Sequence, residues 1–204
     1  MTVEELLARC ELVRASEKRL TECQPFSCGE SDLDEFFAKD CLVNQSRLLG
    51  KTYLFCLKDQ PETIVTAISL SNDSIRLTNR ITDEYKEQFL DDTDLYDKSL
   101  KRFPAVLIGR LGTNKDFAGQ GYGTAIMDFI KVLFRTNNRT GCRFLIVDAL
   151  NRPETLHYYE KNGFHYLIDD ERLEAKYMGI GVGRLPLNTR LMYFDLLKIK
   201  VNEE

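Results

Sequence analysis

The stretch PAVLIGRLGTNKDFAGQGYGTAIMDFIKVLF, residues 104–134, decides the fold. It begins with Pro104 and an apolar run over residues 105–111, which is typical of a fully buried strand. A glycine-rich turn follows at residues 118–123, and apolar residues then recur at helical spacing over residues 124–134. A strand, a glycine turn and a helix in this order predict the crossover unit of an α/β protein.

The flanking sequence predicts further strands and helices of the same domain. Residues 10–15, 52–57 and 63–70 have strand-like alternation or β-branched content, and the last two of these read as a hairpin. Ser31 with Asp34 resembles a capping box and predicts a helix there. Downstream we expect strands at 143–150, 164–168 and 190–197, and a helix at 153–162. The order predicts an α/β fold with parallel pairing in the middle of the sheet.

Residues 71–102 differ from their surroundings because they are polar and acidic. We interpret them as an insertion between two strands of one sheet, helical around residues 83–90, and a solvated loop without a role is the alternative. The chain of 204 residues is then a single domain, 1–204, that carries this acidic insertion.

Composition excludes several classes of protein. The N-terminal residues have neither the basic start nor the apolar run of a signal peptide, so we expect a cytoplasmic protein with no membrane partner. The six cysteines include no CxxC pair, and two histidines are too few for a histidine-based metal site, so no metal is expected. The net charge of −4 argues against a nucleic-acid partner in general, although a local basic patch would leave tRNA open.

The three glycines of the turn, Gly119, Gly121 and Gly123, indicate a diphosphate-binding loop. Glycine lets a ligand approach the backbone, and the first amides of a helix attract negative charge. The spacing does not fit GxGxxG, because the third glycine comes one residue early. The GKT sequence at residues 50–52 is not a Walker loop, because Gln45 replaces the first glycine and a helix precedes it. A tight connection with no ligand is the remaining alternative for the three glycines.

Two ordered motifs resemble the GNAT acetyltransferase superfamily. The sequence GQGYG at residues 119–123 is similar to its acetyl-CoA pyrophosphate loop, although Ala118 stands where the family usually has Arg or Gln. The sequence YEKNGF at residues 159–164 resembles the family's YExxGF signature. Further residues, at 26–29, 33–36, 106–111 and 147–149, are similar to the GNAT branch that contains the aminoacyl-tRNA-acetylating toxins.

The resemblance implies a mixed, mostly antiparallel sheet of about six or seven strands, flanked by helices, with a parallel pair splayed around an acetyl-CoA cleft. It implies acetyl-CoA as co-substrate and Tyr159 as the general acid that protonates the departing thiolate. The residues expected to contact acetyl-CoA are Leu111, Gly112, Thr113, Gly119, Gln120, Gly121, Tyr122, Gly123, Thr124 and Asn151. No general base is identified by the sequence.

These residues predict an acetyl-CoA-dependent N-acetyltransferase that acts on a primary amine by direct attack on the thioester. Two alternatives stay open: a toxin that acetylates aminoacyl-tRNA and is paired with an antitoxin, and a non-catalytic acyl-CoA-binding module. The acidic segment around Asp91, Asp92 and Asp94 favours a cationic small molecule or peptide as acceptor over tRNA. The identity of the acceptor and the presence of a homodimer are left open.

Overall fold

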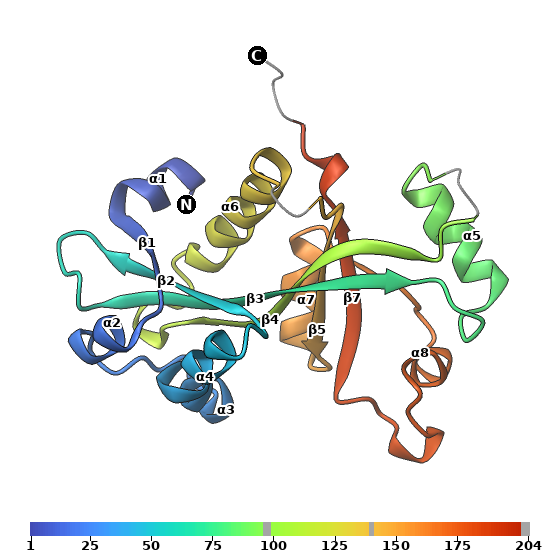
Figure 1. Cartoon of the computed structure of the whole chain (residues 1–204), viewed down its shortest axis with the longest axis horizontal. Helices are drawn as coiled ribbons and strands as arrows, with labels where there is room; N and C mark the ends of the chain where they lie inside the picture. Colours follow the sequence, from blue (N-terminus) through green and yellow to red (C-terminus); the bar gives the residue numbers. More distant parts are fainter. Residues whose placement is uncertain (96–98, 139–140, 201–204) are drawn as a thin grey trace. The chain divides into compact units, whose positions relative to one another are not determined.

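Among the residues that the structure describes, seven strands form one mixed sheet in the order β1-β2-β3-β4-β5-β7-β6 (Figure 1). Their bounds are Cys10–Arg14, Lys51–Leu57, Ile64–Arg76, Arg102–Thr113, Phe144–Leu150, His165–Tyr166 and Thr189–Asp195 for β1 to β7. The pair β4–β5 is parallel, and the pairs β1–β2, β2–β3, β5–β7 and β6–β7 are antiparallel. The predicted fold class, an α/β fold with a mixed sheet and one central parallel pair, is confirmed.

The computed structural model of the protein describes residues 1–95, 99–138 and 141–200. The α-helices are α1 Val3–Arg9, α2 Glu17–Glu22, α3 Ser31–Glu35, α4 Cys41–Ser46, α5 Asp83–Asp92, α6 Tyr122–Thr136, α7 Pro153–Lys161 and α8 Glu171–Met178. Short turns of other helix types are η1 Phe36–Asp40 (a π-helix), η2 Lys115–Phe117, η3 Val182–Arg184 and η4 Leu196–Lys198. Helices α1, α2 and α8 were not predicted.

The chain divides into two compact units, each with a core of its own. The first unit consists of residues 1–72 and 108–132, and the second of residues 73–107 and 133 onward. Strands β3 and β4 and helix α6 contribute residues to both units. The organisation of residues 1–204 as a single acetyltransferase domain stays a prediction.

The core of the first unit lies between the β1–β2–β3 strands and the α3–η1–α4 helical segment. Its buried apolar residues are Ala15, Phe36, Phe37, Cys41, Leu54, Cys56, Ile64 and Ala67. Phe36 and Phe37 meet edge-to-face with ring centroids 5.3 Å apart, and both belong to η1. The π-helix therefore supplies the largest side chains of this core.

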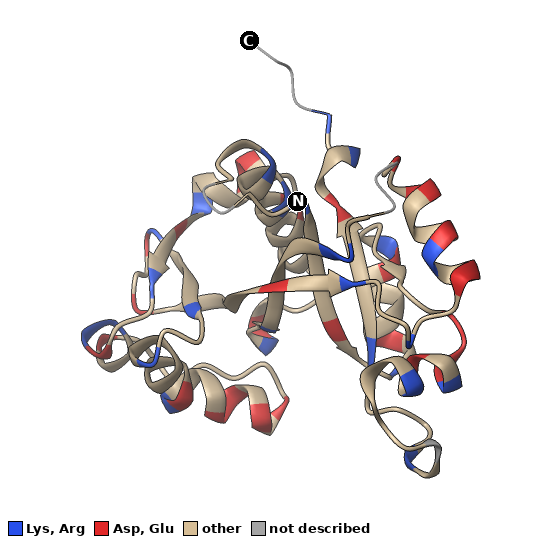
Figure 2. Cartoon of the chain, turned by 45° about the vertical axis from the view of Figure 1, so that its right-hand side comes forward, with Lys and Arg blue, Asp and Glu red and all other residues tan. Residues whose placement is uncertain are grey.

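The core of the second unit includes part of the segment predicted to be an insertion. Strand β3 runs to Arg76, so the first residues of that segment are strand rather than loop. Ile81 and Phe89 are 3% and 2% exposed, and the Phe89 ring lies 5.4 Å from that of Phe144. The other face of α5 carries exposed acidic residues, and Figure 2 shows them along the helix. The segment is therefore amphipathic. Residues 96–98 of it lie outside the described residues.

The capping box expected at Ser31 is not formed. Helix α3 has Glu30 at its N-cap position, with no side-chain hydrogen bond to the helix. The Asp34 carboxylate instead accepts hydrogen bonds from the preceding loop, at Ser27 and Cys28. The prediction failed because the carboxylate has donors outside the helix, which a spacing rule within the helix does not consider.

Candidate functional site

The end of β4, where the thioester is predicted to bind, is packed closely against a loop of the first unit. A Cβ atom placed on Gly112 would lie 3.1 Å from the Cys28 Sγ and 3.3 Å from the Phe26 Cζ. The hydroxyl groups of Thr66 and Thr113 are 3.3 Å apart, within hydrogen-bonding distance. A side chain at position 112 would therefore require the Cys28 and Phe26 side chains of the 26–28 loop to shift.

Asp34 holds that loop in place. Its Oδ2 accepts a hydrogen bond from the Ser27 hydroxyl at 2.8 Å, and its Oδ1 accepts one from the Cys28 N–H at 2.7 Å and one from the Cys28 thiol at 3.1 Å. The Ser27 carbonyl accepts from the Lys115 N–H at 2.9 Å, which ties the loop to η2 beyond β4. Desolvation would raise the pKa of Asp34, but the hydrogen bonds from Cys28 and Ser27 outweigh it and lower that pKa.

The predicted diphosphate loop has the backbone geometry that only glycine adopts easily. Gly119 and Gly121 have φ angles of +73° and +86°, and α6 begins directly after them, at Tyr122. A Cβ atom on Gly119 would meet no other atom within 4 Å, whereas one on Gly121 would lie 3.2 Å from the Met1 nitrogen. The backbone is therefore open to a ligand at Gly119 and covered by Met1 at Gly121.

Side chains of this loop are engaged with the protein itself. The Gln120 Nε2 donates a hydrogen bond to the Asp116 carbonyl at 2.9 Å. The Tyr122 ring is 3% exposed and meets Phe117 edge-to-face at 5.6 Å. Any contribution of Gln120 and Tyr122 to ligand binding is thus expected from their backbone. Thr124, in the first turn of α6, is exposed.

Tyr159, the predicted general acid, is the buried residue of α7 in the second unit. It is 6% exposed, and its ring contacts those of Tyr158 at 5.1 Å and Phe164 at 5.4 Å. Burial raises the pKa of Tyr159 well above its usual value of 10.0. The neighbouring Tyr158 is only half-buried, so the two tyrosines occupy different environments.

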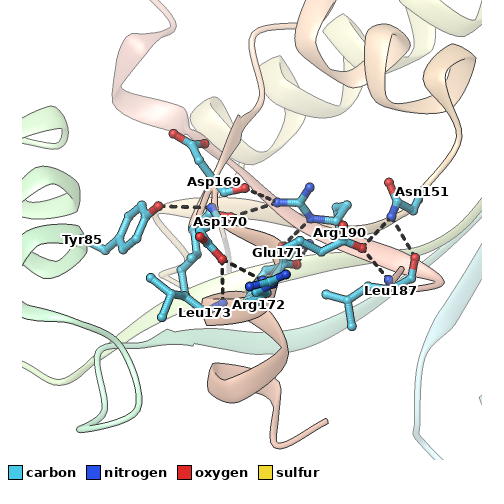
Figure 3. Close-up of polar contacts among 12 residues, drawn as sticks. Tyr85, Asn151, Asp169, Asp170, Glu171, Arg172, Leu173, Leu187 and Arg190 are labelled. Carbon is cyan, nitrogen blue, oxygen red and sulfur yellow. Dashed lines mark hydrogen bonds and ion pairs between the residues drawn. The ribbon is translucent and has the colours of Figure 1, made fainter. Parts of the chain in front are cut away.

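Asn151, at the end of β5, is part of a polar network in the second unit (Figure 3). Its Nδ2 donates hydrogen bonds to the Glu171 Oε1 at 3.0 Å and to the Leu187 carbonyl at 2.8 Å. Glu171 also accepts from the Leu187 N–H. The side-chain nitrogen of Asn151 is therefore used to join β5, α8 and the segment before β7.

An ion pair between Glu174 and Arg190 continues this network from α8 to β7. The side chains of Glu174 and Arg190 are 1% and 10% exposed, and the Arg190 Nε donates to the Glu174 Oε2. The Arg190 guanidinium also donates to the carbonyls of Ile168 at 3.1 Å and Asp169 at 2.9 Å. Burial raises the pKa of Glu174, and hydrogen bonds from Leu191 and Arg190 oppose that shift. Sequence reasoning missed this pair, since no local motif marks it.

The residues predicted to form the site thus fall into two groups. Residues 111–113 and 119–124 belong to the first unit, and Asn151 and Tyr159 belong to the second. Within the first unit the two segments are joined by η2, whose N-cap Asn114 donates hydrogen bonds from its backbone to Val65 and from its side chain to Ile64. The roles assigned to all of these residues stay predictions.

Comparison with known proteins finds a family model that matches part of the chain and solved structures with the same fold. The model of the acetyltransferase (GNAT) domain matches residues 87–166. A tyrosine-to-phenylalanine variant of KacT has the same fold, with 16% identity, a TM-score of 0.67 and coverage of 93% of this chain and 96% of that one. AtaT in complex with acetyl-methionyl-tRNAfMet is similar, with 17% identity, a TM-score of 0.64 and the same coverage of both chains.

A third structure, a variant of the AtaT toxin bound to acetyl-CoA and to the C-terminus of the antitoxin AtaR, shares 17% identity at a TM-score of 0.59. It covers 93% of this chain and 95% of that one. No helix in the described part of the chain is long and apolar enough to cross a bilayer. Residues 87–166 thus match the GNAT acetyltransferase domain model, and the chain shares its fold with solved acetyltransferase structures that include toxins.

Proposed function

We propose that the protein transfers the acetyl group of acetyl-CoA to a primary amine. The observation that carries this proposal is the loop before α6, where Gly119 and Gly121 have positive φ and the backbone at Gly119 is open. It lies within the segment that matches the GNAT family model. A diphosphate suits such a loop because backbone N–H groups and the helix dipole favour negative charge there. Structural neighbours solved with acetyl-CoA support the choice of co-substrate.

The residues that would hold acetyl-CoA follow from this assignment. The amides of residues 119–124 would bind the diphosphate. Leu111, Gly112 and Thr113 would face the pantetheine arm and the acetyl carbonyl, and Asn151 is a further predicted contact of CoA. The close packing of Gly112 on the 26–28 loop supports a preorganised strand end, as an oxyanion site requires.

Tyr159 would protonate the sulfur that leaves the thioester. The amine attacks the carbonyl carbon, the carbon–sulfur bond breaks, and the phenol protonates the departing thiolate. The proton that the amine loses on becoming an amide returns through water to the phenolate, which restores the neutral tyrosine. A raised pKa keeps the phenol protonated over the whole physiological range, so the donor form is always present. The solved structures of KacT and AtaT include tyrosine-to-phenylalanine variants.

A pair of matched glycine variants tests the acetyl-CoA site. Gly119 and Gly141 have φ angles of +73° and +70°, and a Cβ atom on either would meet no other atom within 4 Å. Gly119→Asp and Gly141→Asp therefore introduce the same strain and the same charge. Calorimetry should show acetyl-CoA binding weakened at least tenfold by Gly119→Asp, because the carboxylate would repel the diphosphate. Equal binding by the two variants would place the diphosphate elsewhere.

Aminoacyl-tRNA is the second candidate acceptor, and the complex of AtaT with acetyl-methionyl-tRNAfMet favours it. The acidic face of α5 and the net charge of −4 favour a cationic small amine instead. Incubation with labelled acetyl-CoA and separate pools of polyamines, amino acid amides, peptides and charged tRNA would distinguish the two. Transfer to charged tRNA alone would establish that the protein acetylates aminoacyl-tRNA, and it would predict an antitoxin partner. Acetyl-CoA binding without transfer to any pool would leave a non-catalytic binding module.

A further inference from the structure

Asn114 lies between the two segments of the first unit that are predicted to bind acetyl-CoA. It directly follows the last residue of β4, and it is the N-cap residue of η2, which leads into the glycine loop at residues 118–123. Its backbone N–H, its backbone carbonyl, its Nδ2 and its Oδ1 all take part in hydrogen bonds. A residue whose polar atoms are all engaged is held in one position and orientation.

On one side Asn114 is bound to β3. Its N–H donates to the Val65 carbonyl at 2.8 Å, and its Nδ2 donates to the Ile64 carbonyl at 3.0 Å. Val65 and Ile64 are 0% and 3% exposed, so both acceptors belong to the packed interior of the first unit. Asn114 is thereby anchored to a part of the fold that moves little.

A bulge in β3 lies at this double contact. Phe55 pairs with Thr66 and Cys56 with Ile64, so Val65 is an extra residue in β3. The carbonyls of successive residues in a regular strand point in opposite directions, and a bulge disturbs that alternation. One asparagine therefore reaches the carbonyls of Ile64 and Val65 together.

On the other side Asn114 starts η2. Its Oδ1 accepts from the Asp116 N–H at 3.1 Å, and its carbonyl accepts from the Phe117 N–H at 2.9 Å. The Phe117 ring meets that of Tyr122, the first residue of α6, edge-to-face at 5.6 Å. The Gln120 Nε2 donates to the Asp116 carbonyl at 2.9 Å. The glycine loop is thus connected to β3 through the hydrogen bonds of Asn114.

The glycine loop depends on the position of its backbone for any affinity. Residues 118–123 include no charged side chain, and the side chains of Gln120 and Tyr122 contact the protein itself. A diphosphate would therefore be held by backbone N–H groups, and hydrogen bonds weaken steeply when the donor is misplaced. Acetyl-CoA carries its diphosphate and its thioester at opposite ends of the pantetheine arm. Binding both ends at once requires a fixed separation between the loop and the end of β4.

We propose that Asn114 is a positioning residue that sets the separation between the diphosphate loop and the end of β4. The proposal rests on the proposed acetyl transfer and deepens it, because it assigns the joining of the two parts of the acetyl-CoA site to a residue outside the predicted contacts. The hydroxyl groups of Thr66 and Thr113, 3.3 Å apart, add a further link between β3 and the end of β4. Asn114 acts in this role through the backbone that it holds, not by contact with the ligand.

Asn114→Ser tests the proposal, because a serine at the N-cap can still accept from the Asp116 N–H but is too short to reach the Ile64 carbonyl. Calorimetry would use two probes: acetyl-CoA, and phosphoadenosine diphosphate, the part of CoA that lacks the pantetheine arm. Asn114→Ser should bind phosphoadenosine diphosphate within about twofold of the wild type and acetyl-CoA about tenfold more weakly. Asn72→Ser, the same substitution at an exposed position of β3, is the matched control and should bind both probes as the wild type does.

Equal weakening of the two probes would show that Asn114 only maintains the loop, and unchanged binding of both would show that the separation does not depend on it. Either result would overturn the proposal. Amide hydrogen exchange provides a readout without ligand: the amide of residue 114 should exchange faster in Asn114→Ser, whereas the amides of Asp116 and Phe117 should stay protected. Equal loss of protection at all three would reduce Asn114 to a helix cap. A wild type that binds neither probe would refute the proposed acetyl-CoA site, and this role of Asn114 with it.

Discussion

Replacing Asp34 by alanine should release the loop that packs against Gly112. Three hydrogen bonds end on its carboxylate, from the Ser27 hydroxyl and from the N–H and thiol of Cys28. Hydrogen bonds to a charged acceptor contribute about 1.5–3 kcal/mol each when buried. The thiol is a weak donor and water can reach this half-exposed site, so we expect a total loss of about 2 kcal/mol. That corresponds to a fall in Tm of about 4–8 °C for a chain of this size.

The measurement is unfolding followed by circular dichroism, because the chain has no tryptophan. Asp32→Ala is the matched control, since Asp32 is an exposed acidic residue of the same short helix. Asp34→Ala should also lower kcat/KM for any acceptor, because Gly112 loses its support. If the two variants unfold within about 0.5 kcal/mol of each other, the carboxylate does not hold the loop.

The contribution of Asp34 should depend on pH in a defined direction. Its pKa in the folded protein lies below the usual 3.8, so the ionised form stabilises the fold. The advantage of the wild type over Asp34→Asn should be fully present above pH ~5 and decrease as the pH falls through the lowered pKa. An advantage that is independent of pH between ~3 and 7 would show that the charge is not the cause.

Three further predictions concern the second unit. Tyr159→Phe should lower kcat by about 10²-fold with acetyl-CoA affinity unchanged. A larger effect of Tyr158→Phe would show that Tyr158, not Tyr159, is the proton donor. Because the pKa of Tyr159 is raised, its deprotonation should cause no loss of rate below pH ~10. A triple variant that neutralises Asp91, Asp92 and Asp94 should have a higher KM for a cationic acceptor. The salt dependence of that KM should be weaker, and acetyl-CoA binding should be unchanged. Glu174→Ala should destabilise the protein to urea by about 3–5 kcal/mol, because it leaves Arg190 buried and unpaired. A loss below about 1 kcal/mol would mean that water reaches the pair.

The sequence predicted the elements that have strong apolar patterns. The buried run after Pro104 and the helix after Gly123 correspond to β4 and α6, within a few residues at each end. The β2–β3 hairpin was predicted from its β-branched residues, and the structure confirms it. In these segments local propensity and burial agree, so a reading of periodicity is sufficient.

Helix α8 shows why other elements were missed. Its two buried residues are Glu174 and Ala175, and its larger apolar side chains, Leu173 and Tyr177, are only partly buried against the core, so the apolar stripe of the helix is short. Polar contacts hold it as well: the Asp170 side chain accepts from two N–H groups of its first turn, and Glu174 pairs with Arg190. Asp170 at the start and Gly179 in the left-handed conformation at the end are capping signals that could have revealed it.

The candidate site was predictable in part for a similar reason. The glycine spacing predicted an irregular turn before a helix, and the structure gives Gly119 and Gly121 positive φ, with open space only at Gly119. The close approach of Gly112 to Phe26 and Cys28 joins residues distant in sequence. Local spacing does not reveal such a contact, because it depends on how the 26–28 loop packs against β4.

The order of the strands bears on how this protein can meet other chains. The sheet ends on β1 and β6, which have five and two residues. Glu11 and Arg14 are exposed on β1, and short, charged edges resist the addition of a further strand. Another polypeptide is therefore not expected to bind by adding a strand to β1 or β6. For the same reason these edges are not expected to start the growth of fibres from copies of this chain. A protein partner is better sought among side-chain contacts on helices and loops, with mutational scans designed accordingly.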